Sequence, residues 1–344
     1  MSTDLRVAVV GAGMMGADHI KRIHTTIAGA SVSAVVEPDP ARRAAALELA
    51  PGASGFGDLD AALASGLVDA VLIATPGQFH EEALLRVLAA GLPILCEKPL
   101  TQDPESSWRI LEAEIAGGRQ LIQVGFMRRF DREYEELRRV VEAGTAGELL
   151  MLHAVHRNAS VPDAYVQNML ITDSVVHEFD VVPWLAGGTI TSVEVRYPKR
   201  NPLTPERLKE PILVLIELDN GVLVDVEMNV SIQFGYQVAT EAVFARGVAR
   251  IGQPSGLQLW SENGFGVGEH ADFTTRFREA YDRQVQAWVD AAKAGTIAGP
   301  SAWDGYKVAV ACKAGVEALG APGRVALDLP PVPAFYAGTA AATV

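Results

Sequence analysis

The chain has 344 residues, a formal net charge of −13, 49% hydrophobic residues and 21% charged residues. This acidic balance argues against a nucleic-acid partner or an anionic membrane, and no uninterrupted apolar run reaches the roughly 18 residues of a membrane span. Two cysteines without a Cys/His cluster predict no metal site and fit a reducing, cytoplasmic compartment, and the amino terminus lacks a signal-peptide pattern.

The first 125 residues alternate between short apolar runs and helical patterns. We expect strands at residues 7–10, 32–36, 70–74, 93–96 and 121–124, and helices at residues 17–27, 40–49, 81–90 and 104–115. Strands that alternate with helices predict a parallel sheet covered on both faces. Because the chain is longer than a single core usually allows, residues 1–125 are expected to form the first of two domains.

Residues 126–330 are expected to form an α+β domain with a large, mostly antiparallel open sheet. A charged helix is expected at residues 131–143, strands at residues 149–157, 190–197, 212–218, 222–230 and 237–245, and helices at residues 273–294 and 303–318. Asp219-Asn220-Gly221, between two of these strands, predicts a hairpin with a tight primed turn, which needs positive φ. Residues 331–344, rich in alanine and proline, are expected to form a surface tail.

A glycine-rich loop, Gly11-Ala12-Gly13-Met14-Met15-Gly16, follows the first strand and opens a helix. The first glycine permits a tight turn, the second lets a pyrophosphate approach the backbone, and the third lets helix and strand pack closely. The helix N-terminus then offers N–H groups and a positive dipole end to the phosphates. This arrangement predicts a Rossmann-type dinucleotide site.

An acidic residue, Glu37, ends the second expected strand. A carboxylate at this place binds the adenosine ribose hydroxyls and repels a 2′-phosphate, so the position favours NAD over NADP. Arg42 and Arg43 lie close by and weaken this preference, unless they form a solvated helix face.

Two segments follow strands at the sheet edge where open α/β sheets bind ligands: Ala74-Thr75-Pro76 and Glu97-Lys98-Pro99. A lysine at a strand end could hydrogen-bond a reacting hydroxyl in the cofactor crevice. The alternative is a surface lysine, but an apolar strand before it and a proline after it favour a functional position.

A second candidate site is the helix expected to begin at Thr172 or Asp173 as its cap. Asp173 and His177 are four residues apart, so both project from one face. A carboxylate there can orient the imidazole, which can accept the proton of an alcohol during hydride transfer. The alternative is a helix cap beside a half-buried histidine. Asp180, on the same face, could be a structural partner of the helix or of the imidazole. A metal site formed by Asp173, His177 and Asp180 is the alternative, but no metal is expected because nicotinamide already accepts the hydride.

His156 and Asn158 are two residues apart on a strand and therefore share a face, whereas His153 lies on the opposite face. If the shared face lines a cleft, the pair binds hydroxyl groups. If it faces solvent, the pair has no such role.

These motifs together resemble the glucose–fructose oxidoreductase/inositol dehydrogenase/rhizopine-catabolism (Gfo/Idh/MocA) family over nearly the whole chain. Three segments resemble the family's inositol 2-dehydrogenases more narrowly: residues 125–131 (GFMRRFD), residues 156–158 (HRN) and residues 172–180 (TDSVVHEFD). One departure is that Gly77 and Gln78 follow the Thr-Pro pair, where the family usually has an asparagine.

The resemblance implies site residues. The implied catalytic residues are Lys98, Asp173 and His177. The implied cofactor-binding residues are Gly11, Gly13, Met14, Met15, Gly16, Glu37, Thr75, Pro76, Glu97 and Lys98. The implied substrate-binding residues are Met127, Arg128, His156, Asn158, Asp173, His177, Tyr236 and Tyr281.

The implied reaction is NAD-dependent oxidation of a secondary hydroxyl of myo-inositol to the 2-keto-inositol, by a chain that forms a homo-oligomer, commonly a tetramer. A neutral polyol suits a site rich in His, Asn, Arg and Tyr, although Arg128 could bind a carboxylate or simply begin the charged helix. The alternatives are another polyol or sugar (scyllo- or chiro-inositol, glucose, an anhydrosugar or an amino sugar), a non-catalytic NAD-binding regulator, and an NAD-dependent glycosidase.

Overall fold

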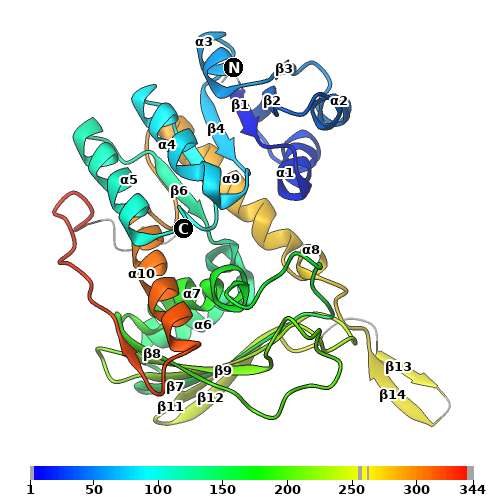
Figure 1. Ribbon diagram of the computed structural model, residues 1–344, viewed down its shortest axis with the longest axis vertical. Coiled ribbons are helices and arrows are strands. Elements are labelled where there is room, and N and C mark those ends of the chain that lie inside the picture. The colour runs from blue at the N-terminus through cyan, green and yellow to red at the C-terminus, as the bar shows by residue number, and fades with distance from the viewer. Residues whose placement is uncertain (1–3, 255–257, 262, 339–344) are drawn as a thin grey trace. The chain divides into compact units, whose positions relative to one another are not determined.

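The computed structural model describes residues 4–254, 258–261 and 263–338. The chain forms two compact units (Figure 1). The first unit comprises residues 1–127, 281–309 and 330–344, and the second comprises residues 128–280 and 310–329. The chain therefore returns to the first unit, which differs from the linear division at residue 125 that the sequence predicts. The physical reason is the packing of two C-terminal segments, described below.

The first unit contains a six-stranded parallel sheet in the order β3-β2-β1-β4-β5-β6. The strands are β1 (Leu5–Val10), β2 (Ala30–Val36), β3 (Ser54–Phe56), β4 (Ala70–Ile73), β5 (Ile94–Glu97) and β6 (Ile122–Gly125). This is the strand order of a Rossmann dinucleotide-binding domain. The expected parallel sheet is confirmed, and the short strand β3 is an addition.

Helices connect these strands. They are α1 (Met14–Thr25), α2 (Pro40–Leu49), α3 (Leu59–Ala64), the 3-10 turn η1 (Gly77–Phe79), α4 (His80–Ala89) and α5 (Pro104–Gly117). Asp39, Asp58 and Asp103 cap α2, α3 and α5 by accepting hydrogen bonds from backbone N–H groups. Helix α3 is another element beyond those expected.

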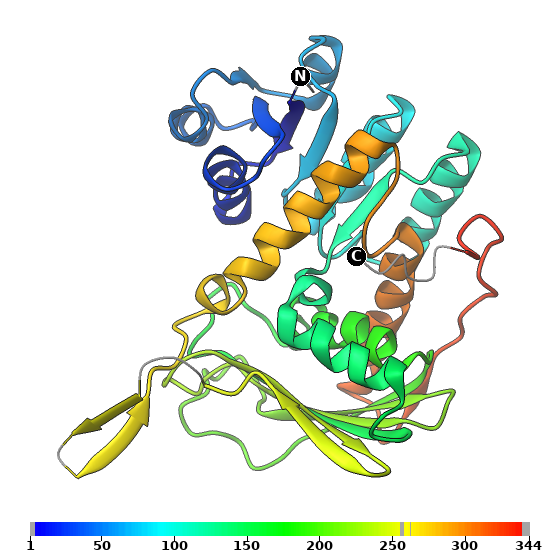
Figure 2. The same ribbon diagram turned by 180° about the vertical axis from the view of Figure 1, so that it is seen from behind.

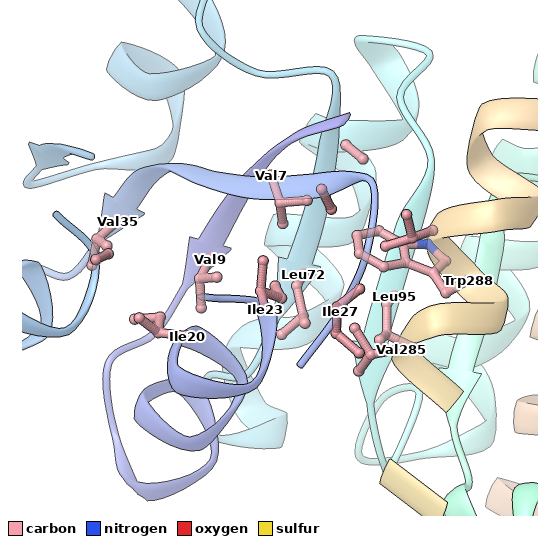
Figure 3. Packing of buried hydrophobic residues seen from close by; sticks show 14 of the residues in the cluster. Val7, Val9, Ile20, Ile23, Ile27, Val35, Leu72, Leu95, Val285 and Trp288 are labelled. Atoms are coloured by element: carbon pink, nitrogen blue, oxygen red, sulfur yellow. The ribbon is translucent and has the colours of Figure 1, made fainter. Parts of the chain in front are cut away.

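Part of helix α9 (Arg278–Ala294) completes the core of the first unit. Val285 and Trp288 of this helix are buried with Ile27 and Leu95 in one hydrophobic cluster (Figure 3). This burial explains why a segment that follows the second sheet in sequence belongs to the first unit.

The C-terminal segment also packs on the first unit. Tyr336 is 3% exposed, and its hydroxyl donates a hydrogen bond to Glu114 Oε2 at 2.6 Å. The side-chain amide of Gln120 donates to the carbonyl oxygen of Phe335 at 2.7 Å. Residues 331–338 are otherwise mostly exposed, so the expected surface tail stays a prediction, with Tyr336 as its anchor; residues 339–344 lie outside the described residues.

The second unit is built on a seven-stranded sheet in the order β12-β11-β7-β10-β9-β8-β15. The strands are β7 (Leu149–Arg157), β8 (Ile190–Arg196), β9 (Ile212–Leu218), β10 (Leu223–Asn229), β11 (Gln237–Phe244), β12 (Gly247–Ile251) and β15 (Val325–Ala326). Only the β7–β10 pair of this sheet is parallel. The mostly antiparallel sheet is confirmed. A separate two-stranded sheet pairs β13 (Gln258–Ser261) with β14 (Gly264–Val267).

Helices of the second unit lie on one face of its large sheet (Figures 1 and 2). They are the 3-10 turn η2 (Met127–Phe130), α6 (Arg132–Ala143), the π-helical turn η3 (Leu170–Val175), α7 (Val176–Ala186), α8 (Phe273–Arg276) and the later part of α10 (Ala302–Ala318). Helix α6 ends at Gly144 in the left-handed conformation, as its sequence predicts. No helix of the described chain is long and apolar enough to cross a membrane.

Two local predictions in this unit are wrong. The β9–β10 hairpin forms, but Gly221 has a φ of +85° and Asn220 does not have a positive φ, so the turn is not the primed type with two such residues. The helix expected at residues 273–294 is broken at Phe277, which is fully buried between α8 and α9. Its ring packs edge-on against Tyr236, with a centroid distance of 6.4 Å.

Candidate active site

The three loop glycines of the first unit differ in what surrounds them. A Cβ on Gly11 would lie 2.8 Å from the Thr75 nitrogen, and one on Gly16 would lie 1.9 Å from the Gly11 oxygen. A Cβ on Gly13 would meet nothing within 4 Å. The outer two glycines thus serve close packing, and the middle one leaves the backbone open, as a bound pyrophosphate requires. Met14, at the start of α1, is 68% exposed beside this opening, and Met15 follows it.

Glu37 lies just beyond β2, with its side chain beside the glycine loop. Its carboxylate accepts hydrogen bonds from the Ala12 N–H at 3.0 Å and from Arg42 Nη2 at 2.7 Å. Burial raises the pKa of this carboxyl, but the hydrogen bonds outweigh burial, so its pKa lies below the ordinary value and it stays charged. Arg43 is half-buried and donates to the Glu37 carbonyl oxygen at 2.6 Å, whereas Arg42 keeps an exposed side chain while it pairs with Glu37.

Thr75 and Lys98 follow β4 and β5, which are neighbouring strands. The Thr75 hydroxyl oxygen is buried and has no hydrogen-bond partner among the described residues. An orphaned polar atom at the carboxyl edge of the sheet suits a ligand group. Pro76 beside it is exposed, and Lys98 is half-buried. Together with the open backbone at Gly13, these features fit a dinucleotide.

Glu97 is engaged within the first unit. Its carboxylate lies 2.7 Å from His19 Nε2, and Arg22 Nη1 lies 3.3 Å from His19 Nδ1. An arginine only donates, so Nδ1 accepts and the Nε2 hydrogen is donated to Glu97. Glu97 therefore ties β5 to α1, the helix that begins at the glycine loop. Tyr281 packs edge-on against His19 at 6.0 Å, so it lies in the first unit rather than the second.

The second unit holds a buried ion pair between Arg128 and Glu178, each 1% exposed. Arg128 Nη2 donates to His156 Nδ1 at 3.1 Å, and Glu178 Oε2 lies 3.3 Å from the same nitrogen. Burial raises the pKa of Glu178, but the charges and hydrogen bonds of Arg128 and His156 together outweigh burial and leave the pKa below its ordinary value. The Arg128 charge is thus compensated inside the fold, and Arg128 does not begin the charged helix α6.

Three aromatic rings gather beside this ion pair. His156 lies 6.4 Å from His177 and 6.0 Å from Tyr236, measured between ring centroids. Burial raises the pKa of Tyr236 above its ordinary value, so its hydroxyl stays protonated as a hydrogen-bond donor. The structure therefore brings together Arg128, His156, His177 and Tyr236, as expected of substrate-binding residues.

Asn158 follows β7, and its side-chain oxygen Oδ1 is buried without a hydrogen-bond partner in the part of the chain that the structure describes. Met127 is 2% exposed and is the last residue of the first segment of the first unit. His156 is 3% exposed and Asn158 is half-buried, so the pair does not face bulk solvent as the alternative requires.

The helix that carries Asp173 and His177 begins earlier than the sequence predicts. A π-helical turn over Leu170–Val175 leads directly into α7, so neither Thr172 nor Asp173 is an N-cap. The Thr172 hydroxyl instead donates to the Asn168 carbonyl oxygen at 3.3 Å. Asp180 pairs with Arg129 at 2.5 Å, which makes it a structural partner of η2. Among the described residues, no cluster of His, Cys, Asp or Glu is placed to hold a metal ion.

Sequence reasoning missed two residues that shape these sites. Glu178 lies in a segment that carries the family resemblance, but its role as the ion-pair partner of Arg128 cannot be predicted from that segment. The two residues are 50 positions apart in sequence. His19 lies three residues beyond the last loop glycine, and nothing local predicts its contact with Glu97.

The fold and site geometry are those of a nucleotide-dependent oxidoreductase, and comparison with known proteins agrees. Residues 5–126 match the model of the oxidoreductase family with an NAD-binding Rossmann fold (GFO_IDH_MocA), and residues 134–250 match the GFO/IDH/MocA C-terminal domain. The chain belongs to the Gfo/Idh/MocA family.

Individual relatives are similar over nearly their whole length. Inositol 2-dehydrogenase of Corynebacterium glutamicum is 64% identical over 338 residues, which cover 98% of this chain and 100% of that protein. Inositol 2-dehydrogenase of Leifsonia xyli subsp. xyli is 65% identical over 335 residues, which cover 97% and 98%. The solved myo-inositol dehydrogenase from Lactobacillus casei, in complex with NAD(H) and myo-inositol, is similar with a TM-score of 0.94 and 31% identity, and the match covers 97% of this chain and 100% of that one.

Proposed function

We propose that this protein oxidises a secondary hydroxyl of myo-inositol to the 2-keto-inositol, with NAD as cofactor. The observation that carries the proposal is the 64–65% identity to inositol 2-dehydrogenases along nearly the full chain. The glycine loop, Lys98, Asp173 and His177 are all present, as the reaction requires. This set argues against a non-catalytic regulator.

The proposed chemistry assigns one role to each catalytic side chain. NAD, when bound, supplies the hydride acceptor. His177 takes the hydroxyl proton, since an imidazole titrates near neutral pH. Asp173 orients His177 and stabilises its charge. Lys98 donates a hydrogen bond to the reacting oxygen and favours its alkoxide character.

A neutral polyol fits the second unit better than an acid does. The one buried guanidinium expected to meet substrate, Arg128, already pairs with Glu178. It is therefore not available as the sole counter-ion of a carboxylate or phosphate. His156, Asn158 and Tyr236 supply the donors and acceptors that ring hydroxyls need, and Met127 and Tyr281 are proposed as further substrate contacts.

Glu37 supports NAD over NADP. Its charged carboxylate lies beside the glycine loop and would repel a 2′-phosphate. The neighbouring Arg42 is held by Glu37 rather than offered to a phosphate. We propose Met14, Met15, Thr75, Pro76 and Glu97 as residues near the cofactor, with Glu97 acting through its support of β5.

A panel of polyols tests the proposal. The purified chain is mixed with NAD or NADP and with myo-, scyllo- or chiro-inositol, glucose, an anhydrosugar or an amino sugar, and NADH formation is followed. We expect myo-inositol with NAD to give the highest kcat/KM. A higher value with scyllo-inositol would favour that isomer, which is bound by a structural neighbour at 26% identity. No turnover with any polyol would favour a regulator, and aglycone release from a chromogenic glycoside without NADH would favour a glycosidase.

We further propose a homo-oligomer, specifically a tetramer, located in the cytoplasm. Helices cover only one face of the large sheet in the described part of the second unit (Figures 1 and 2). An uncovered sheet face commonly pairs between subunits. Light scattering during gel filtration measures the subunit number, and cell fractionation with an antibody tests the location. Both cysteines are buried and neither forms a disulfide, which fits a reducing compartment.

A further inference from the structure

His80 joins the two loops that follow β4 and β5. It is the first residue of α4, and its side chain is fully buried. Its ring nitrogen Nδ1 lies 2.7 Å from the Pro99 carbonyl oxygen, and Nε2 lies 2.8 Å from the Thr75 carbonyl oxygen. A single imidazole therefore spans the two segments proposed to meet the cofactor and the reacting hydroxyl.

The same two loops touch each other next to His80. A Cβ placed on Gly77 would lie 3.3 Å from Cγ of Pro99, which is closer than most packed side chains allow. The glycine thus lets η1 approach the proline that follows Lys98.

The hydrogen bonds of His80 specify its protonation state. A carbonyl oxygen only accepts, so each ring nitrogen must donate for both bonds to form. A neutral imidazole carries one N–H, and its other nitrogen would then face a carbonyl oxygen lone pair to lone pair. Both bonds form together only when the ring is an imidazolium.

Cys96 is the neighbouring side chain that could supply a counter-charge to the ring. The neighbouring Cys96 Sγ, 3.4 Å from Nδ1, gives no counter-charge, since burial raises the pKa of that thiol well above its ordinary value. Two charge-assisted hydrogen bonds favour the cation. The charge is therefore tied to the position of both carbonyls.

We propose that His80 is a positioning residue that, protonated on both ring nitrogens, holds the Thr75 loop and the Lys98–Pro99 loop at a fixed spacing. The proposal rests on the proposed function only in taking these loops as the cofactor-binding edge of the sheet. A histidine that merely fills core volume would need neither the second N–H nor a particular spacing of the loops.

Neutron diffraction from crystals of the full chain at neutral pH tests the protonation state without any variant. We expect deuterium on both Nδ1 and Nε2 of His80. Deuterium on one nitrogen alone overturns the proposal. This result does not depend on which substrate the enzyme oxidises.

Two substitutions test the positioning role. In His80→Gln the side-chain amide reaches the place of Nε2, and in His80→Asn it reaches the place of Nδ1, so each keeps one of the two bonds. We expect NAD to bind on the order of tenfold more weakly to each variant. His24→Gln, at an exposed histidine of α1, is the matched control and should bind NAD like the parent.

The readout is NAD affinity by fluorescence titration, with circular dichroism to verify folding. Parent-like affinity in both folded variants overturns the proposal. If neither variant folds, the neutron result alone decides it. Because no polyol is present, weakened NAD binding supports the role of His80 even if myo-inositol proves to be the wrong substrate.

Discussion

The Arg128–Glu178 ion pair offers the most quantitative test of the second unit. Glu178→Gln removes one charge and leaves Arg128, which is 1% exposed, without a carboxylate partner. Removing one member of a buried ion pair typically costs ~3–5 kcal/mol. The introduced amide would still accept a hydrogen bond, so we expect the lower end, ~3 kcal/mol, or roughly a hundredfold fall in the ratio of folded to unfolded chain.

The assay is urea unfolding followed by circular dichroism. With a slope of ~3 kcal/mol/M, the expected loss lowers the midpoint by about 1 M. Hydrogen exchange in peptides from β7 and α7 assigns the loss to the second unit. The double variant Arg128→Met/Glu178→Leu is the control, because two apolar side chains leave no buried charge, and it should be more stable than Glu178→Gln by ~2 kcal/mol. A parent-like midpoint for Glu178→Gln, or equal losses in the single and double variants, would refute this reasoning.

Three further predictions concern other parts of the chain. Gly13→Ala should weaken NAD binding on the order of tenfold without changing the melting temperature, since its Cβ enters the open space proposed for the phosphates. Gly16→Ala should instead lower the melting temperature, because its Cβ meets the Gly11 oxygen. NAD titration and thermal melts of both variants distinguish the two effects. His177→Ala should lose roughly 10²- to 10⁴-fold in kcat while keeping its NAD affinity, and turnover within a few-fold of the parent would remove His177 as the base. Burial raises the pKa of Glu114, so its contribution to stability is present below about pH 4.5 and is lost as the pH rises through the higher folded value. Glu114→Gln should therefore make the free energy of unfolding decrease less steeply with rising pH above about pH 4.5. An unchanged pH dependence would contradict a raised pKa of Glu114.

Local patterns predict the nucleotide half well. The spacing of Gly11, Gly13 and Gly16 fixes a turn, an open backbone and a close contact within six residues, so short-range geometry suffices. The positions of Thr75 and Lys98 follow from the rule that parallel strands end at one edge.

Contacts between distant residues could not be predicted in this way. Glu178 and Arg128 are 50 positions apart, and Tyr336 and Glu114 are 222 apart, so only the folded chain shows that each pair is buried. The return of α9 to the first unit could not be predicted for the same reason. The sequence shows that α9 has an apolar face, but it does not show which of the two cores buries that face. The π-helical turn before His177 differs from the expected cap because the Thr172 hydroxyl donates back to the Asn168 carbonyl oxygen instead of capping a helix.

The most direct test of the proposed reaction follows the hydrogen atom itself. myo-Inositol carrying deuterium at C2 is incubated with the full chain and NAD, and the reduced cofactor is analysed by mass spectrometry. We predict that NADH carries one deuterium and that a 2-keto-inositol accumulates in equal amount. Unlabelled NADH, or inositol left unchanged, would contradict oxidation at this carbon.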